Sequence, residues 1–69
     1  MNELAALVRA TREKAGLTQG QLAEACGWSR QRITNIERGN TNIRVAVLQQ
    51  IADAMGLRLR ITFMKLKNS

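Results

Sequence analysis

The chain lacks histidine and proline, has a single cysteine, and holds one tryptophan and one phenylalanine as its only aromatic residues. Without histidine, and with one cysteine, it has no His-paired nucleophile, no zinc site with two or more Cys or His ligands, and no internal disulfide. No segment approaches the run of about 20 apolar residues that a membrane span needs. We therefore expect no enzyme activity, no metal or other cofactor, and no membrane partner.

The N-terminus is also poor in the features of an export signal. It carries Asn2 and Glu3 rather than a basic stretch followed by an apolar core. We therefore expect the protein to be cytoplasmic.

Positive charge predominates among the charged residues. The chain of 69 residues has 11 Lys and Arg against 5 Asp and Glu, and a formal net charge of +6. Because 45% of its residues are hydrophobic, we expect one folded domain rather than a disordered chain. A chain this short is marginally stable alone, so self-association is expected. The basic balance predicts a polyanionic partner, with nucleic acid as the first choice.

The positive charge is concentrated in two segments. Residues 28–44 hold four arginines against Glu37, a net charge of +3, and residues 57–69 hold four Lys and Arg and no acid, a net charge of +4. Either segment can be an ordinary solvated surface. The second segment has three further interpretations: charged strand edges that suppress aggregation, added DNA-backbone contacts, or a docking surface for an acidic partner.

Four segments have the apolar spacing of amphipathic helices, and a glycine follows each of them. They are residues 3–15, 19–26, 30–38, and a fourth from Val45 to Met55. Thr18 and Ser29 are suited to cap the second and third helices. The expected inward residues are Leu4, Leu7, Val8 and the stem of Arg12 in the first helix, Leu22, Ala23 and Cys26 in the second, Ile33 and Ile36 in the third, and Val45, Leu48, Ile51, Ala52 and Met55 in the fourth.

After Gly56 the pattern changes from helical spacing to alternation. Apolar and polar residues alternate along 57–63, and a helix would divide the apolar ones into two separate stripes. The sequence predicts a strand, whose natural partner is the same strand of a second chain. We therefore expect a mainly α protein with a four-helix domain in residues 1–56, and a dimerisation strand with a short basic tail in residues 57–69. The apolar residues of that strand are Leu57, Leu59, Ile61 and Phe63.

The second and third expected helices form the arrangement that points to a function. Two short helices joined by a tight, glycine-containing turn are the layout of a helix-turn-helix DNA reader. Arg presents two donors to guanine, and Asn or Gln pairs with adenine through two hydrogen bonds. The polar face of the third helix therefore predicts contacts to the bases of double-stranded DNA from Arg30, Gln31, Thr34 and Asn35.

Four short pieces of sequence occur in a fixed order. They are Leu17-Thr18-Gln19-x-x-Leu22-Ala23, Gly27-x-Ser29, Ile33-x-x-Ile36-Glu37-Arg38-Gly39 and Leu48-x-x-Ile51-Ala52-x-Ala54-Met55-Gly56. In this order and spacing, residues 4–56 resemble the phage-repressor (Cro-type, lambda-repressor-like) helix-turn-helix family. The resemblance implies a helical DNA-binding domain that acts as a homodimer on an inverted repeat, usually as a repressor.

The resemblance also implies roles for single residues. Arg30 and Gln31 match the first base-reading positions, and Asn35 matches a later one, with Thr34 beside it. Gln19 matches a glutamine that binds a phosphate and braces the third helix. The implied contacts to the DNA backbone are Gln19, Ser29, Arg38, Asn40 and Thr41. Arg12 and Glu37 match a partly buried salt bridge between the first and third helices.

Three features depart from the family pattern. Trp28 stands where a small aliphatic residue is usual, and it either covers the core or leans toward the DNA. Gly20 stands where a good helix former is usual, and it either loosens the helix or permits close approach to a phosphate. The strand after Gly56 replaces a fifth helix and is similar to that of the HipB-like antitoxins, which repress their own operon and bind a kinase-like toxin. The alternatives are a stand-alone phage or restriction-control repressor, or a partner-binding module with residual DNA binding.

Overall fold

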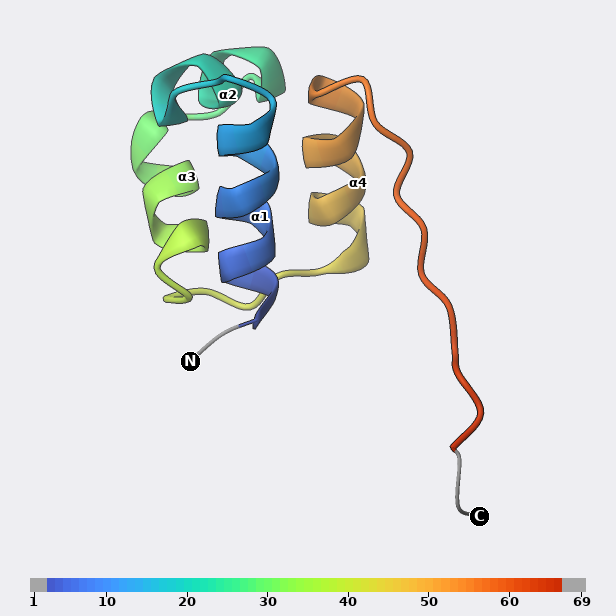
Figure 1. Ribbon diagram of the computed structural model, residues 1–69. Helices are drawn as coiled ribbons and strands as arrows, with labels where there is room; N and C mark the ends of the chain where they lie inside the picture. Colours follow the sequence, from blue (N-terminus) through green and yellow to red (C-terminus); the bar gives the residue numbers. More distant parts are fainter. Residues whose placement is uncertain (1–2, 67–69) are drawn as a thin grey trace.

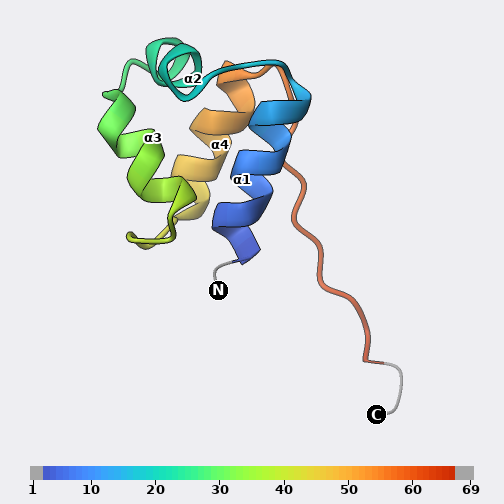
Figure 2. The ribbon, with the colours of Figure 1, turned by 60° about the vertical axis from the view of Figure 1, so that its left-hand side comes forward.

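The computed structural model describes residues 3–66, and within them it contains four α-helices and no strand. The helices are α1 (Glu3–Lys14), α2 (Gln19–Cys26), α3 (Arg30–Glu37) and α4 (Val45–Ala54). Figures 1 and 2 show α2 at the end of the domain where α1 finishes and α3 begins. The prediction of a mainly α, four-helix domain is confirmed, and each helix ends within one residue of its expected end. No helix in residues 3–66 is long and apolar enough to cross a membrane.

The core lies where the helices meet, and it is small. Its buried cluster consists of Val8, Leu22, Ala23, Ile33, Ile36 and Ile51. Leu22, Ile33 and Ile36 are the most completely buried large side chains, with 2% or less of their surface exposed. Each such side chain contributes about 1.5–3 kcal/mol through burial. The core is thus centred on α2 and α3, and it fixes how these two helices sit against each other.

The turn between α2 and α3 is closed by backbone hydrogen bonds. Gly27 has φ +73°, its N–H donates to the carbonyl of Glu24 at 3.1 Å, and the N–H of Trp28 donates to the carbonyl of Ala23 at 2.8 Å. This is the Schellman ending of a helix, for which a left-handed residue is needed. Ser29 then caps α3 by accepting a hydrogen bond from the N–H of Arg32 at 3.2 Å. The turn therefore holds α3 at a defined angle to α2.

Two glycines, one inside α2 and one directly after it, are expected to respond to alanine in opposite directions. Gly27→Ala should lower the free energy of unfolding by about 1 kcal/mol, because a Cβ is disfavoured at positive φ. Gly20→Ala should raise it by about 1 kcal/mol, because Gly20 is inside a helix and its Cβ would meet only Thr18 Oγ1, at 3.9 Å. Urea unfolding of both variants measures the two changes. Equal changes in the same direction would contradict this account of the turn.

Three residues that the helical spacing placed inward are exposed in the structure. Leu4 and Leu7 are 42% and 59% exposed, and Val45 is 60% exposed. Val8 and Arg12 are buried as predicted, and Ala5 completes the buried stripe of α1, because α1 packs against α3 and turns its leucines away from that contact. Val45 is the first residue of α4, at the end of this helix that is remote from α2 (Figure 1). The prediction was wrong at these positions.

Residues 57–66 run away from the helices as an extended segment without regular secondary structure (Figures 1 and 2). The expected strand needs a partner strand from a second chain, and residues 3–66 of the single chain contain none. Pairing across a dimer therefore stays a prediction. Leu57 and Leu59 line an apolar groove with Leu48, Ile51 and Met55, whereas Phe63 is fully exposed. Lys67, which was counted in the second basic segment, lies outside the described residues.

Candidate nucleic-acid interface

The face of α3 that points away from the core carries two amide side chains. Ile33 and Ile36 are buried, and at about 100° per residue Gln31 and Asn35 lie opposite them. The Nε2 atom of Gln31 donates a hydrogen bond to Oδ1 of Asn35 at 3.0 Å. The two amides therefore lie side by side, one helical turn apart. Their remaining donors and acceptors are free to pair with base edges.

The other two expected base-reading residues lie toward the flank of α3 that faces α2. Arg30 is exposed and lines a depression with Arg12, Thr18, Gln19 and Gly20. The hydroxyl of Thr34 lies 3.1 Å from Oε1 of Gln19 and 3.1 Å from the carbonyl of Arg30, both acceptors for its single proton. The structure thus engages the Thr34 hydroxyl inside the domain and leaves the guanidinium of Arg30 at the surface.

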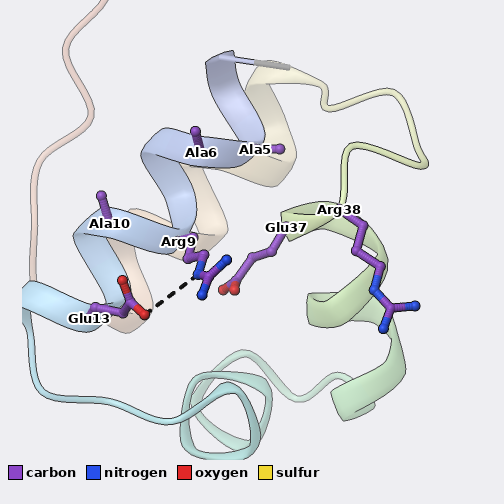
Figure 3. Close-up of a pocket in the computed structure, with 7 residues that line it drawn as sticks. All are labelled: Ala5, Ala6, Arg9, Ala10, Glu13, Glu37 and Arg38. Carbon is purple, nitrogen blue, oxygen red and sulfur yellow. Dashed lines mark ion pairs between the residues drawn. The ribbon is translucent and has the colours of Figure 1, made fainter. Parts of the chain in front are cut away.

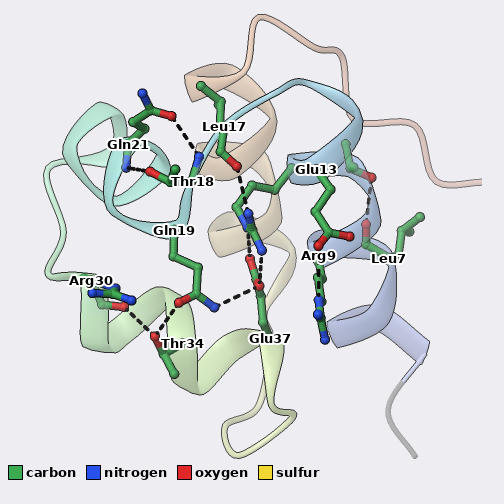
Figure 4. A network of polar contacts seen from close by, with 12 residues as sticks. Leu7, Arg9, Glu13, Leu17, Thr18, Gln19, Gln21, Arg30, Thr34 and Glu37 are labelled. Carbon is green, nitrogen blue, oxygen red and sulfur yellow. Dashed lines mark hydrogen bonds and ion pairs between the residues drawn. The ribbon is translucent and has the colours of Figure 1, made fainter.

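Gln19 connects α3 to a buried ion pair (Figure 4). While its Oε1 accepts from Thr34, its Nε2 donates to Oε1 of Glu37 at 3.2 Å. Glu37 in turn accepts two hydrogen bonds from Arg12, at 2.6 Å from Nε and 3.0 Å from Nη2. Arg12 also donates to the carbonyl of Leu17 at 2.8 Å. This network joins α1, α2 and α3, and the structure thus contains the Arg12–Glu37 pair that the resemblance implied.

The ion pair is nearly dry, and this affects the ionisation of both partners. The side chains of Arg12 and Glu37 are 10% and 3% exposed. Burial by itself raises the pKa of the Glu37 carboxyl, but hydrogen bonds from Arg12 and Gln19, with the charge of Arg12, outweigh it and hold the pKa below its ordinary value. The hydrogen bond with Glu37 likewise raises the pKa of Arg12. Both groups are therefore charged at neutral pH.

The lowered pKa of Glu37 predicts a loss of stability in acid. Because the folded pKa lies below the ordinary value of 4.5, the ionised carboxylate stabilises the fold above pH 4.5. That stabilisation is lost as the pH falls from 4.5 through the folded pKa. We expect the melting temperature of the wild type to drop in this pH range. The Glu37→Gln variant should melt at a lower temperature than the wild type at pH 7, and its melting temperature should change less with pH. Parallel pH profiles for the two proteins would contradict this origin.

The expected backbone contacts after α3 are all at the surface. Arg38, Asn40 and Thr41 are exposed. Arg38 borders a cleft between α1 and the end of α3, of about 310 Å³, whose wall includes Arg9 and Glu37 (Figure 3). Arg9 is paired with Glu13, one turn further along α1, at 3.5 Å, whereas Arg38 points away from the other labelled residues. The position of Arg38 thus leaves its charge free for a ligand outside the domain.

The turn residue Trp28 contacts both the core and an arginine of α3. It packs against the buried cluster, as the interpretation of Trp28 as a core residue requires, and Cys26 packs there as well. Burial raises the pKa of the Cys26 thiol, which agrees with its interpretation as a small apolar residue. The guanidinium of Arg32 lies over the Trp28 ring. Arg32 was not among the site residues expected from sequence, because its contact with Trp28 depends on the fold of the turn before α3.

The described residues offer no metal-ligating cluster. Across residues 3–66 no group of three or more His, Cys, Asp or Glu side chains is placed to hold a metal ion. The polar groups of the interface are instead amides, hydroxyls and guanidinium groups. These are the donor and acceptor types that contact bases and phosphates.

Comparison with known proteins gives a family match and two relatives. A sequence model of the helix-turn-helix family matches residues 8–61. An uncharacterized HTH-type transcriptional regulator of Methanothermobacter thermautotrophicus is 40% identical over 50 residues, 72% of this chain and 72% of that protein. The uncharacterized HTH-type transcriptional regulator y4dJ of Sinorhizobium fredii is 41% identical over 49 residues, 71% of this chain and 62% of that protein. The chain thus matches less than two thirds of the second relative's length.

Proposed function

Because this chain belongs to the helix-turn-helix family, we propose that it is a transcription regulator that binds specific DNA sequences through α3 and has no enzymatic role. The two relatives named as HTH-type transcriptional regulators support the proposal. The observation that carries it is the pair of amides, Gln31 and Asn35, presented on the outward face of a helix that the core and a polar network hold in place. A helix that is held in place and carries amides on its outward face suits the major groove.

The contacts divide into two kinds. Gln31 and Asn35 read bases through their amides, Arg30 reads a base from the flank, and Thr34 contributes its methyl group, which can meet the methyl group of thymine. Gln19 uses one N–H for Glu37 and keeps the second for a phosphate. Other phosphate contacts come from the exposed groups around α3, which set the register without reading sequence. These groups are Ser29, Arg38, Asn40 and Thr41.

The salt dependence of binding tests this proposal against the partner-binding alternative. Each phosphate neutralised by Lys or Arg should make the logarithm of the affinity fall by about 0.9 per logarithmic unit of salt. We expect a steep loss of affinity for duplex DNA between low and moderate salt. A flat response, or no binding to duplex DNA, would favour a partner-binding module instead.

The proposed regulator is a homodimer that acts as a repressor on an inverted repeat. Its pairing element is the extended segment after Gly56, in which Ile61 and Phe63 are 59% and 100% exposed. Apolar side chains on an unpaired strand favour association with a second copy. A two-fold dimer would present two copies of α3 to two half-sites. The apolar groove beside Leu57 and Leu59 lies at the start of this segment.

A charge on the apolar side of the segment is expected to separate the two chains. Ile61→Lys should give a monomer with much weaker operator binding, because a single half-site holds the protein poorly. Thr62→Lys is the matched control, since consecutive residues of a strand face opposite sides. Sedimentation equilibrium measures the mass, and a titration with DNA measures the affinity. A stable dimer of Ile61→Lys would place the interface elsewhere.

The regulated system we propose is a toxin–antitoxin operon, in which this chain is a HipB-like antitoxin that also binds a kinase-like toxin. The exposed Met64 and Leu66, 85% and 79% exposed, provide apolar surface for such a partner. Co-expression with the adjacent gene and a native mass measurement test the role. Two chains plus a larger protein would support the antitoxin. A bare dimer would favour a stand-alone phage or restriction-control repressor.

A further inference from the structure

Arg32 is stacked on the only tryptophan of the chain. Its guanidinium carbon lies 3.9 Å from the centroid of the Trp28 ring. This is well inside the distance of about 6 Å at which a cation is attracted to an aromatic face. Because Trp28 also packs against the core, its ring has less freedom than that of an exposed tryptophan.

The backbone on both sides of the stack is fixed as well. The N–H of Trp28 donates to the carbonyl of Ala23 at 2.8 Å, and the N–H of Arg32 is within hydrogen-bonding distance of both the hydroxyl and the carbonyl of Ser29, at 3.2 and 3.1 Å. The α2–α3 turn therefore restricts the Cα position of Trp28, and the first helical turn of α3 restricts that of Arg32. Both side chains of the stack thus extend from backbone with little freedom.

Arg32 lies on the opposite flank of α3 from Arg30. Two residues apart on a helix, these side chains are rotated by about 200° from each other. Arg30 borders the side of α2, with Thr18 and Gln19, whereas Arg32 lines a small depression with Asn35, Thr41 and Asn42. A helix in the major groove has one phosphate backbone along each flank. Each flank of α3 thus carries one arginine among polar side chains.

The donors of Arg32 are not used within the domain. In residues 3–66 its guanidinium N–H groups have no hydrogen-bond or ion-pair partner, and its contact with Trp28 is to the ring. By contrast, Arg9 and Arg12 are paired with Glu13 and Glu37. A stacked guanidinium keeps its in-plane N–H donors available to a phosphate.

We infer that Arg32 binds a DNA phosphate on the flank of α3 that faces the loop after it, and that Trp28 is the positioning residue that holds it there. The inference rests on the proposed DNA-binding function. Stacking removes freedom from the arginine before DNA arrives, so less ordering is needed on binding. Lysine at position 32 would keep the charge but lose the planar stack.

Salt titrations of three variants test the phosphate contact. Arg32→Ala should lower affinity about tenfold for specific and shuffled DNA alike, as for a lost hydrogen bond to a charged group. It should also reduce the salt slope by about 0.9 for each bound protomer. Arg32→Lys should keep the slope but bind more weakly than the wild type. Lys14→Ala, which removes a charge beside Ala15 and Leu57 and away from α3, should change neither quantity.

A double-mutant cycle tests the role of Trp28. Trp28→Leu keeps an apolar cover on the core but removes the ring, and it should weaken binding about threefold while leaving the salt slope intact. In the Arg32→Ala background the same change should have little effect. Circular dichroism establishes the temperature below which every variant is folded, and binding is measured below that temperature.

The possible failures are distinguishable. A wild-type chain that binds no DNA would contradict the proposed function itself. If the wild type binds and Arg32→Ala has the same affinity and salt slope, only the Arg32 contact is wrong. A change in sequence preference without a change in slope would contradict the phosphate assignment. Equal losses from Trp28→Leu with and without Arg32 would show that Trp28 does not act through Arg32.

Discussion

Replacing Glu37 with alanine is expected to lower the free energy of unfolding by about 3–5 kcal/mol, because it leaves Arg12 as a buried charge without its partner. The side chain of Arg12 is only 10% exposed, and Glu37 accepts two of its hydrogen bonds. The same change also removes the acceptor of Gln19. Since domains have a total stability of about 5–15 kcal/mol, and small ones lie low in that range, the variant should be largely unfolded at moderate temperature.

Two controls separate the buried charge from a general effect of mutation. Glu13→Ala breaks an exposed pair, with side chains 64% and 56% exposed, and should cost well under about 1 kcal/mol. Replacing both buried partners with apolar residues, Arg12→Met with Glu37→Leu, should recover much of the loss. Thermal unfolding followed by circular dichroism measures all three. A Glu37→Ala protein that melts like the wild type would show that the pair does not hold α1 to α3.

The second large effect is expected at the DNA bases. Gln31→Ala and Asn35→Ala should each cost about 1–3 kcal/mol at particular operator positions, because each removes a pair of hydrogen bonds to one base. Arg38→Ala should weaken binding to all sequences alike, since its contact is to the backbone. Gln19→Ala should also weaken all sequences alike. Binding titrations against a panel of single-base operator variants measure the position of each loss.

The hydrogen bond between Gln31 and Asn35 adds a specific expectation to this test. Since the two amides are joined at 3.0 Å, the losses from the single variants should not add in the double variant. The loss from Arg38→Ala should add to either of them, because Arg38 caps the C-terminal end of α3 and, within residues 3–66, makes no side-chain hydrogen bond with Gln31 or Asn35. If base and backbone variants lose the same affinity on operator and shuffled DNA, the assignment of α3 as the reader is wrong.

The helices were predictable because residues close in sequence determine where each helix begins and ends. Thr18 and Ser29 cap α2 and α3 by hydrogen bonds to the backbone, as expected from their type and place. Glycines follow the helices at positive φ, and Ile33 and Ile36 are buried at the expected spacing. These features depend on neighbours within a few residues, so sequence alone reports them.

Contacts between helices were harder to predict from sequence. The spacing did not show that Ala5 rather than Leu4 or Leu7 faces inward, because that depends on the direction from which α3 meets α1. The bond from Thr34 to Gln19 and the stack of Arg32 on Trp28 likewise depend on how the elements are packed. Pairing of the segment after Gly56 depends on a second chain. The Arg12–Glu37 pair came from family resemblance rather than from spacing.

The central claim is that α3 reads a DNA sequence, and selection from a random duplex library tests it most directly. The intact chain is incubated with the library, bound DNA is recovered over several rounds at moderate salt, and the enriched sequences are determined. We expect an inverted repeat whose two half-sites are bound far more tightly than shuffled DNA, with the enrichment altered in Gln31→Ala. Recovery of DNA without any enriched sequence would contradict the claim. So would enrichment of the same sequence by the wild type and by the double variant Gln31→Ala, Asn35→Ala.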